Sequence, residues 1–397
     1  MKYIEDTELE NKKEILLLEL KRIASFRLLP QEYEDLDVCV FSMGKVGKFA
    51  FQGLDWYFGN KLKYVCDSDI SQFTSKKYKG RDVITMDKLV EIKDKCAVIV
   101  TSEKYGEEIS NKLFSRAIKN IWVINGDPVS KLMDICYAKY AVKMLPKVWP
   151  LFSDAISKKI LLERLTKMFF MVGLPIHSYQ STPQCLRPAL LTPQNPPMNA
   201  YYDPDHYFPS DIIKLSDDEC FVDGGAYIGD TIDSFIDKTG NKFKKYFAFE
   251  IDIDNYNKCK EKFKNDPRII PYNFGISNEN KKMIMNLDAI PTEYRLVSGK
   301  AAGREVNVVS VDELLKDEQV TFIKMDVEGE EMNALEGCVN TIKNQKPKLA
   351  ISAYHKASDI FDVPMWINGV CPEYKLFLRH HDARTNILNE TVCYAVK

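Results

Sequence analysis

The sequence predicts two α/β folds, one in each half of the chain, each built on a parallel sheet. Short β-rich runs alternate with helical patterns from Asp37 to Asn125, and the alternation resumes at Cys220. Such alternation is typical of parallel strands joined by helices that cover the sheet. The second half ends in two strand-like runs, 374–381 and 391–397, with no room for a helix between them. We therefore expect the second sheet to close with an antiparallel hairpin.

The remaining segments flank or connect these folds. The opening 22 residues form an acidic amphipathic pattern rather than the basic and then apolar pattern of a secretory signal. Residues 182–209 contain seven of the eighteen prolines, which excludes regular helix there. The expected regions are an N-terminal helix (1–36), a Rossmann-like α/β domain (37–126), a helical and proline-rich connector (127–209) and a second α/β domain (210–397).

Composition excludes several classes of protein. Lys and Arg number 55 against 57 Asp and Glu, so a net charge of -2 gives no electrostatic reason to bind nucleic acid. The longest apolar run, 168–176, is far shorter than the roughly 20 residues that span a bilayer. The ten cysteines include no C-x-x-C pair, so neither structural zinc nor a disulfide framework is expected. We expect a soluble cytoplasmic protein, and a homo-oligomer is compatible with this sequence.

In the first fold, the turn after the first strand has an incomplete nucleotide signature. Gly44 and Gly47 follow that strand, and Asp67 ends the next one. The third glycine of a dinucleotide fingerprint and the upstream glycine of a Walker loop are both missing. The region resembles the Rossmann-like domains attached to nucleotide-sugar and surface-polysaccharide enzymes. It can bind a nucleotide sugar, or it can have a structural or dimer-forming role. Its expected strands are 38–43, 61–67, 82–86, 96–102 and 120–125.

In the second fold, the expected parallel strands are 220–225, 245–251, 268–276, 320–327 and 348–355. Parallel strands followed by a terminal hairpin are the arrangement of class I methyltransferases. The expected fold class is therefore α/β, with a C-terminal class I methyltransferase Rossmann-like fold and an N-terminal Rossmann-like domain.

The turn after the first of these strands indicates a ribose-bearing ligand. Asp223 ends the strand, and Gly225 and Gly229 allow a tight turn that a ligand can approach. The spacing D-x-G-x-x-x-G has fewer glycines than a pyrophosphate-binding loop, which suits S-adenosylmethionine because that cofactor has a ribose but no pyrophosphate. Glu250 ends the next strand, where an acid can accept hydrogen bonds from ribose hydroxyls. Taken alone, Asp223 and Glu250 can equally be helix caps.

Acidic residues gather at the end of the fourth strand. Asp326, Glu328 and Glu330 follow Lys324 within a few positions. Carboxylates this close repel one another unless a cation, hydroxyl groups or helix-start amides satisfy them. Glu330 is an ordinary first-turn helix residue, whereas Asp326 ends an apolar strand and is expected to face the cleft where open α/β sheets bind ligands.

Several segments resemble the FkbM family of S-adenosylmethionine-dependent methyltransferases. They are "VDGGAYIGDT", "FAFEID" and, above all, "IKMDVEGEEMNALEG", and the likeness covers roughly residues 200–397. The resemblance implies O-methylation of a hydroxyl, usually on a sugar or a natural product, and here favours surface polysaccharide or glycan biosynthesis. By position it implies that S-adenosylmethionine is held by Asp223, Gly225, Gly229 and Glu250, with Asn273 and Gly275 on the adenine side.

The catalytic assignments follow from the chemistry of methyl transfer. A hydroxyl is a poor nucleophile until a base removes its proton, and His355 lies on the same sheet edge as Asp326. Asp326 can orient His355, bind the sugar, or join Glu328 in a Mg²⁺ site, so a divalent metal stays open. Glu328, Arg379 and His380 are expected beside the cleft as substrate contacts.

Each assignment has an alternative. His355 can be a hydrogen-bonded structural residue, and Arg379 and His380 can be surface-strand residues. An oxidoreductase of nucleotide sugars that uses NAD in the first fold, and a non-catalytic nucleotide-binding scaffold, are the competing functions. The expected acceptor is a sugar, a nucleotide sugar or a glycan.

Overall fold

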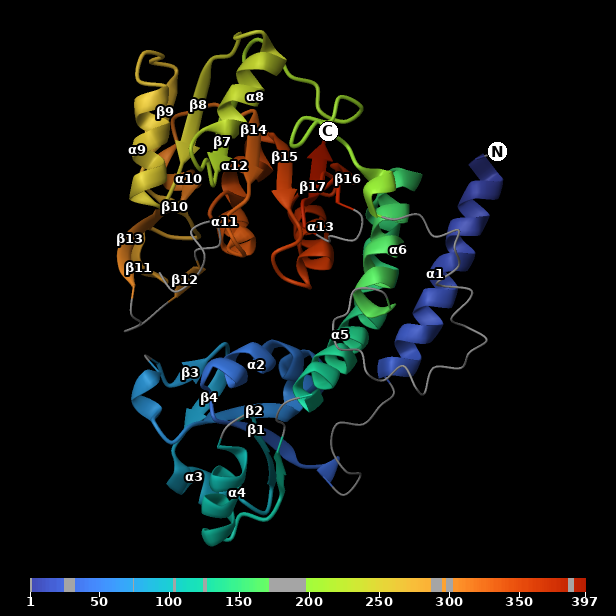
Figure 1. The fold of residues 1–397 in the computed structure, drawn as a ribbon, viewed down its shortest axis with the longest axis vertical. Helices are drawn as coiled ribbons and strands as arrows, with labels where there is room; N and C mark the ends of the chain where they lie inside the picture. The colour runs from blue at the N-terminus through green and yellow to red at the C-terminus, as the bar shows by residue number, and fades with distance from the viewer. Residues whose placement is uncertain are drawn as a thin grey trace. The chain divides into compact units, whose positions relative to one another are not determined.

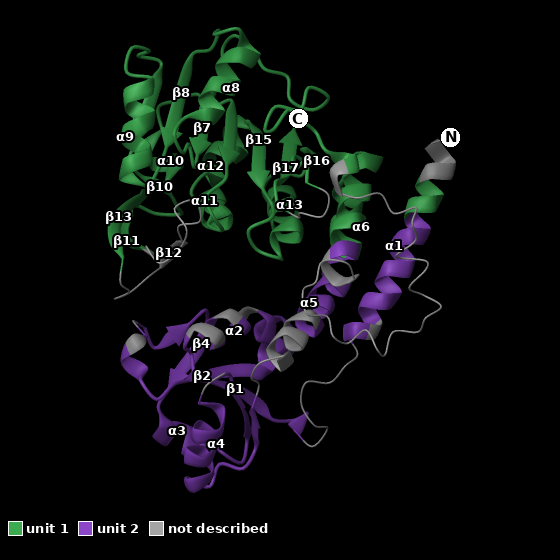
Figure 2. Ribbon diagram, in the orientation of Figure 1, with its two compact units in different colours: residues 1–9, 146–165, 195–397 green, residues 10–145, 166–194 purple. Residues whose placement is uncertain are grey.

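The computed structural model describes residues 2–24, 33–73, 75–102, 105–123, 127–170, 198–286, 295–297, 303–384 and 389–397. Residues 171–197 of the connector, which include 182–197 of its proline-rich part, lie outside these ranges. The chain divides into two compact units. One contains residues 1–9, 146–165 and 195–397, and the other contains residues 10–145 and 166–194 (Figure 2).

The second of these units is built on a six-stranded sheet in the order β3-β4-β2-β1-β5-β6 (Figure 1). All its pairings are parallel except that of β3 with β4. Alternate residues of β1 enter separate core clusters, Val38 and Val40 on one side and Cys39 and Phe41 on the other, so helices cover both faces. The strands are β1 (Asp37–Phe41), β2 (Leu62–Cys66), β3 (Lys77–Tyr78), β4 (Arg81–Ile84), β5 (Cys96–Val100) and β6 (Ile121–Val123).

The turn after β1 is closed by contacts within the protein. The Asp67 carboxylate accepts hydrogen bonds from the backbone N–H groups of Met43 and Asp69. A Cβ on Gly47 would lie 2.0 Å from the Ser42 carbonyl oxygen, so glycine is needed there for close packing of helix on strand. A nucleotide ligand of this unit stays a prediction.

Helices connect most of the strands in both units. The α-helices are α1 (Lys2–Ala24), α2 (Lys45–Phe58), α3 (Met86–Glu91), α4 (Gly106–Ser115), α5 (Asp127–Val148), α6 (Ala155–Phe170), α8 (Asp230–Thr239), α9 (Ile253–Lys262), α10 (Val311–Leu314), α11 (Glu331–Glu336), α12 (Val339–Gln345) and α13 (Asp359–Val370). Within the described ranges, every helix is too short or too polar to span a bilayer.

The other unit contains the class I methyltransferase-like sheet that the sequence predicted, in the order β16-β17-β15-β14-β7-β8-β9. Its central pairings are parallel, and β17 lies antiparallel between β15 and β16. The terminal hairpin is therefore confirmed. The strands are β7 (Cys220–Gly224), β8 (Lys245–Phe249), β9 (Ile269–Tyr272), β14 (Phe322–Met325), β15 (Lys348–Ser352), β16 (Lys375–His380) and β17 (Thr391–Val396).

A small second sheet was not predicted. The single strand expected over 268–276 is two strands, because β9 ends at Tyr272 and β10 begins at Gly275. Between them the Asn273 side-chain amide donates to the Glu250 and Ile251 carbonyls, which holds the chain to the loop after β8. The small sheet has the order β10-β13-β11-β12, with β10 (Gly275–Ile276), β11 (Lys281–Asn286), β12 (Arg295–Val297) and β13 (Arg304–Val309).

Candidate active site

A cavity of about 670 Å³ lies at the carboxyl edge of the seven-stranded sheet. Loops after β7, β8 and β9 line its first side, which includes Gly225, Tyr227, Glu250 and Gly275. Loops after β14 and β15 line its second side, which includes Asp326, Glu328 and His355. This is the edge at which open α/β sheets bind ligands.

The turn after β7 needs glycine at two positions. Gly225 and Gly229 have φ angles of +79° and +85°, which residues with a side chain rarely adopt. A Cβ on Gly225 would also lie 2.0 Å from the Asp326 carbonyl oxygen, and a Cβ on Gly229 would meet the Phe263 ring. Gly225 lines the cavity, whereas Gly229 lies at the start of α8, outside the described lining.

Asp223 is placed differently from the sequence prediction. Its side chain is 0% exposed and lies outside the described lining. The Tyr246 hydroxyl donates to Oδ2 at 2.6 Å, and Lys324 Nζ lies 2.9 Å from Oδ1. The structure therefore gives Asp223 protein partners beneath the turn, and direct contact with a cofactor stays a prediction.

Glu250 lines the cavity at the end of β8. Its carboxylate accepts hydrogen bonds from the backbone N–H groups of Tyr227 and Asp252, both at 2.8 Å. Burial raises the pKa of Glu250 to about 7, although these two amides oppose the shift. The carboxylate is thus fixed in position and retains lone pairs for a ligand hydroxyl.

The two residues predicted on the adenine side separate in the structure. Gly275 lines the cavity, whereas Asn273 lies outside the described lining and supports the loop backbone. Apolar lining near Gly275 comes from Phe274, Ile276 and Met285, which the sequence analysis did not identify. Nothing in a run such as "YNFGI" separates a ligand-facing phenylalanine from a core one.

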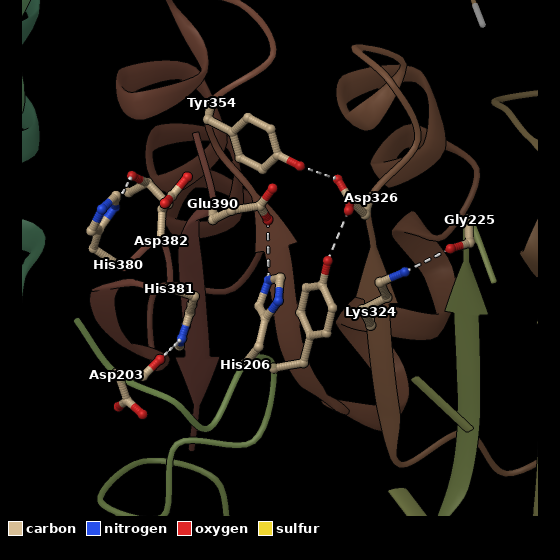
Figure 3. A network of polar contacts seen from close by, with 12 residues as sticks. Asp203, His206, Gly225, Lys324, Asp326, Tyr354, His380, His381, Asp382 and Glu390 are labelled. Carbon is tan, nitrogen blue, oxygen red and sulfur yellow. Dashed lines mark hydrogen bonds and ion pairs between the residues drawn. The ribbon is translucent and has the colours of Figure 1, made fainter. Parts of the chain in front are cut away.

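Asp326 is held by two phenols on the second side of the cavity. Oδ2 accepts from the Tyr207 hydroxyl at 2.8 Å, and Oδ1 accepts from the Tyr354 hydroxyl at 3.0 Å (Figure 3). Burial alone would raise the pKa of Asp326, but nearby Lys324 and His355 and the phenol donor outweigh it, and the pKa is lowered. Asp326 is therefore an ionised, oriented acceptor of hydrogen bonds.

His355 lies among three carboxylates. Its Nδ1 is 2.8 Å from Glu331 Oε1, and its Nε2 is 3.5 Å from Asp326 Oδ1 and 3.4 Å from Glu328 Oε2. Burial opposes protonation, but these carboxylates outweigh it and raise the pKa of His355 to about 9. The imidazole is therefore protonated at neutral pH, so its predicted role as a base requires alkaline conditions.

Asp326, Glu331 and His355 also offer ligand atoms within 4.8 Å of one another, and a divalent metal stays a prediction.

Arg379 and His380 lie outside the described lining. The Arg379 guanidinium pairs with Asp154 and Asp211, so its charge is already matched. His380 Nδ1 lies 3.3 Å from Thr391 Oγ1 in a buried setting. Burial lowers the pKa of His380 to about 4. The geometry lends no support to their predicted contact with substrate, which stays a prediction.

Sequence analysis missed several polar residues of the lining. Among them are His206, Tyr207, Tyr354 and Glu390. His206 stacks on Tyr207 with ring centroids 3.8 Å apart, and its Nε2 lies 3.5 Å from Glu390 Oε2 (Figure 3). The segment that carries His206 and Tyr207 is tied to β16 by a bridge between Tyr202 and His380. Such long-range pairing leaves no local pattern in the sequence.

Comparisons with known proteins agree with this fold. Residues 223–382 match the family model described as the methyltransferase FkbM domain. Among solved structures, methyltransferase FkbM from Methylobacillus flagellatus KT aligns with a TM-score of 0.52 at 20% identity, over 98% of this chain and 99% of that chain. Fibrillarin from Aeropyrum pernix, in complex with natively bound S-adenosyl-L-methionine, aligns at 12% identity with a TM-score of 0.29, over 47% of this chain and 70% of that chain. A search of curated proteins found no match.

Proposed function

The chain carries a methyltransferase domain of the FkbM type, and we propose that this domain transfers the methyl group of S-adenosylmethionine to a hydroxyl of a sugar. The observation that supports the proposal is a single cavity lined by both Glu250 and the Asp326–His355 pair. An acid suited to ribose and a polar group suited to an acceptor hydroxyl thus face one space. We also propose that the protein acts in the cytoplasm, in the biosynthesis of glycans or surface polysaccharides.

The first side of the cavity fits the cofactor. Glu250 is fixed by backbone amides where it can accept hydrogen bonds from ribose hydroxyls. Gly225 lines the cavity with backbone in a conformation that residues with a side chain rarely adopt, and Phe274 and Met285 add apolar surface suited to an adenine ring. When bound, S-adenosylmethionine supplies an electrophilic methyl group.

The second side suits a polyhydroxylated acceptor. Asp326 and Glu328 can accept hydrogen bonds from sugar hydroxyls, and the two phenols on Asp326 fix its direction. In-line methyl transfer requires that the acceptor oxygen be held in line with methyl and sulfur. His355, once neutral, can take the hydroxyl proton as the new bond forms.

Ligand binding tests the proposal directly. S-adenosylmethionine and S-adenosylhomocysteine should each raise the melting temperature, because ligands that bind the folded state stabilise it, and NAD should not. Neutral sugars, nucleotide sugars and glycans are then screened with S-adenosylhomocysteine present, followed by mass analysis of methylated products. Stabilisation by NAD alone would favour an oxidoreductase and contradict the proposal.

A further inference from the structure

Lys324 is a buried cation directly beneath the turn after β7. Its side chain is 2% exposed, and Nζ lies 2.9 Å from Asp223 Oδ1. The same ammonium group donates to the carbonyls of Gly225, at 2.8 Å, and Gly224, at 3.2 Å (Figure 3). The sequence suggested no role for this residue. These three partners are consecutive residues at the carboxyl end of β7.

This lysine remains charged despite its burial. Burial alone would lower the pKa of Lys324, but the Asp223 and Asp326 carboxylates outweigh it, and the pKa is raised. A buried ammonium is costly unless it is paired and hydrogen-bonded. Because two of its partners are backbone carbonyls of the turn, that charge constrains the turn rather than only neutralising Asp223.

The turn is held from both sides. The backbone N–H groups of Gly225 and Ala226 donate to the Phe249 carbonyl, both at 3.0 Å. On the other side, Lys324 donates to the carbonyls of Gly224 and Gly225. Gly225 has a positive φ angle and no side chain to restrict it, so these bonds fix its peptide orientation.

A second lysine–carboxylate pair, whose lysine is 21% exposed, lies at the other end of β7 and provides a comparison. Lys348 on β15 lies 2.7 Å from Glu219 Oε1, and the Glu219 side chain is 0% exposed. Glu219 directly precedes β7, whereas Asp223 lies near its carboxyl end. The two pairs therefore occupy opposite ends of one strand, and only the Asp223 end adjoins the cavity turn.

We infer that Lys324 is a positioning residue for the cofactor, acting through the Gly224 and Gly225 carbonyls. The inference rests on the proposed binding of S-adenosylmethionine at this turn. Without the ammonium group, the Gly225 carbonyl loses the Lys324 donor, whereas the Gly224 carbonyl still accepts from the Asp326 backbone N–H at 3.0 Å. The cavity-facing backbone at Gly225 is then no longer pre-organised for a ligand.

The test compares the two pairs in the full chain. Lys324→Met combined with Asp223→Asn removes the ammonium without leaving a buried carboxylate unpaired. Asp223→Asn alone measures the part of any effect that belongs to the carboxylate, and Lys348→Met with Glu219→Gln is the control pair. Calorimetry measures the Kd of S-adenosylmethionine and S-adenosylhomocysteine, while circular dichroism and melting curves report the fold. Both double variants should melt earlier, but only the Lys324 pair should raise the Kd, by about tenfold or more.

The outcomes separate this inference from the proposed function. A folded Lys324 variant with wild-type Kd, or an equal loss in the control pair, would overturn the positioning role. If the neutral pair does not fold, Lys324→Arg keeps the charge but alters its reach, and an unchanged Kd there would also overturn it. Wild-type protein that binds neither compound would instead contradict the proposed function itself.

Discussion

Replacing the Glu250 carboxylate tests whether the first side of the cavity binds the cofactor. Glu250→Ala removes the acceptor that faces the cavity and also the partner of two backbone amides, each bonded at 2.8 Å. Losing the charged acceptor for ribose hydroxyls should weaken S-adenosylmethionine binding by about 1–3 kcal/mol. That corresponds to a rise in Kd of roughly 5- to 150-fold, which calorimetry resolves.

Asp252→Ala is the matched control for this variant. Asp252 caps α9 by accepting from the backbone N–H groups of Asp254 and Asn255 in the first turn of that helix, and it lies outside the described lining of the cavity. Both variants should lose stability, and only Glu250→Ala should lose affinity. An unchanged Kd in folded Glu250→Ala protein would place the ribose elsewhere and refute the assignment of this side to the cofactor.

The pH dependence of cofactor binding gives a second measurement at the same residue. Burial raises the pKa of Glu250 to about 7, against the effect of its two amides and of Lys324, while nearby Asp252 adds to it. The protonated acid is the poorer acceptor, so affinity should increase as pH rises through about 7. Glu250→Gln should flatten this dependence. A wild-type Kd constant across that range would show that ionised Glu250 is not the group that binds ribose.

Three further variants test the rest of the assignment. Gly44→Val with Asp67→Ala should leave S-adenosylmethionine affinity intact, and a matching loss in folded protein would mean that the two folds are assigned the wrong way round. His355→Ala should bind cofactor normally but lose on the order of 10²–10⁴ in kcat, while wild-type activity should rise as pH approaches 9, since Glu331, Asp326 and Glu328 hold the imidazole protonated below that pH. Near-native turnover would exclude His355 as the base. Tyr207→Phe should lower kcat more than it changes KM, because it removes one donor from Asp326, whereas Tyr202→Phe on the same segment should do neither.

The larger features of the fold were predictable because each leaves a local pattern. The buried parallel strands are continuous apolar runs, and the terminal hairpin follows from two such runs with too little chain between them. The small sheet of β10 to β13 was not predictable, because Lys281 and Lys282 open β11 and β10 has only two residues. β11 and β13 mix charged and apolar residues, so neither is a continuous apolar run like the strands of the larger sheet.

The site was predictable to the extent that position along a strand determines position in the sheet. Glu250, Asp326 and His355 each follow the end of a parallel strand, and all three line the cavity. The same rule did not predict that the Asp223 side chain would be buried outside the described lining. The direction in which a strand-end side chain points depends on its partners across the sheet. Lys324 lies opposite Asp223 on the neighbouring strand, and this pairing draws Asp223 inward.

Three carboxylates near the carboxyl ends of β7 and β14 have partners of different kinds. Asp326 accepts from two phenols, Glu331 accepts from the Val327 and Gly329 backbone amides and contacts His355, and Asp223 pairs with Lys324. The sequence shows the acids but not these contacts, because Tyr207, Tyr354 and His355 come from other segments of the chain and Lys324 lies on a different strand from Asp223. Repulsion among the acids therefore does not require a bound cation. The protonated His355 supplies part of the compensating charge, and the resulting rise of its pKa to about 9 means that any reaction using it as a base should be slow at neutral pH.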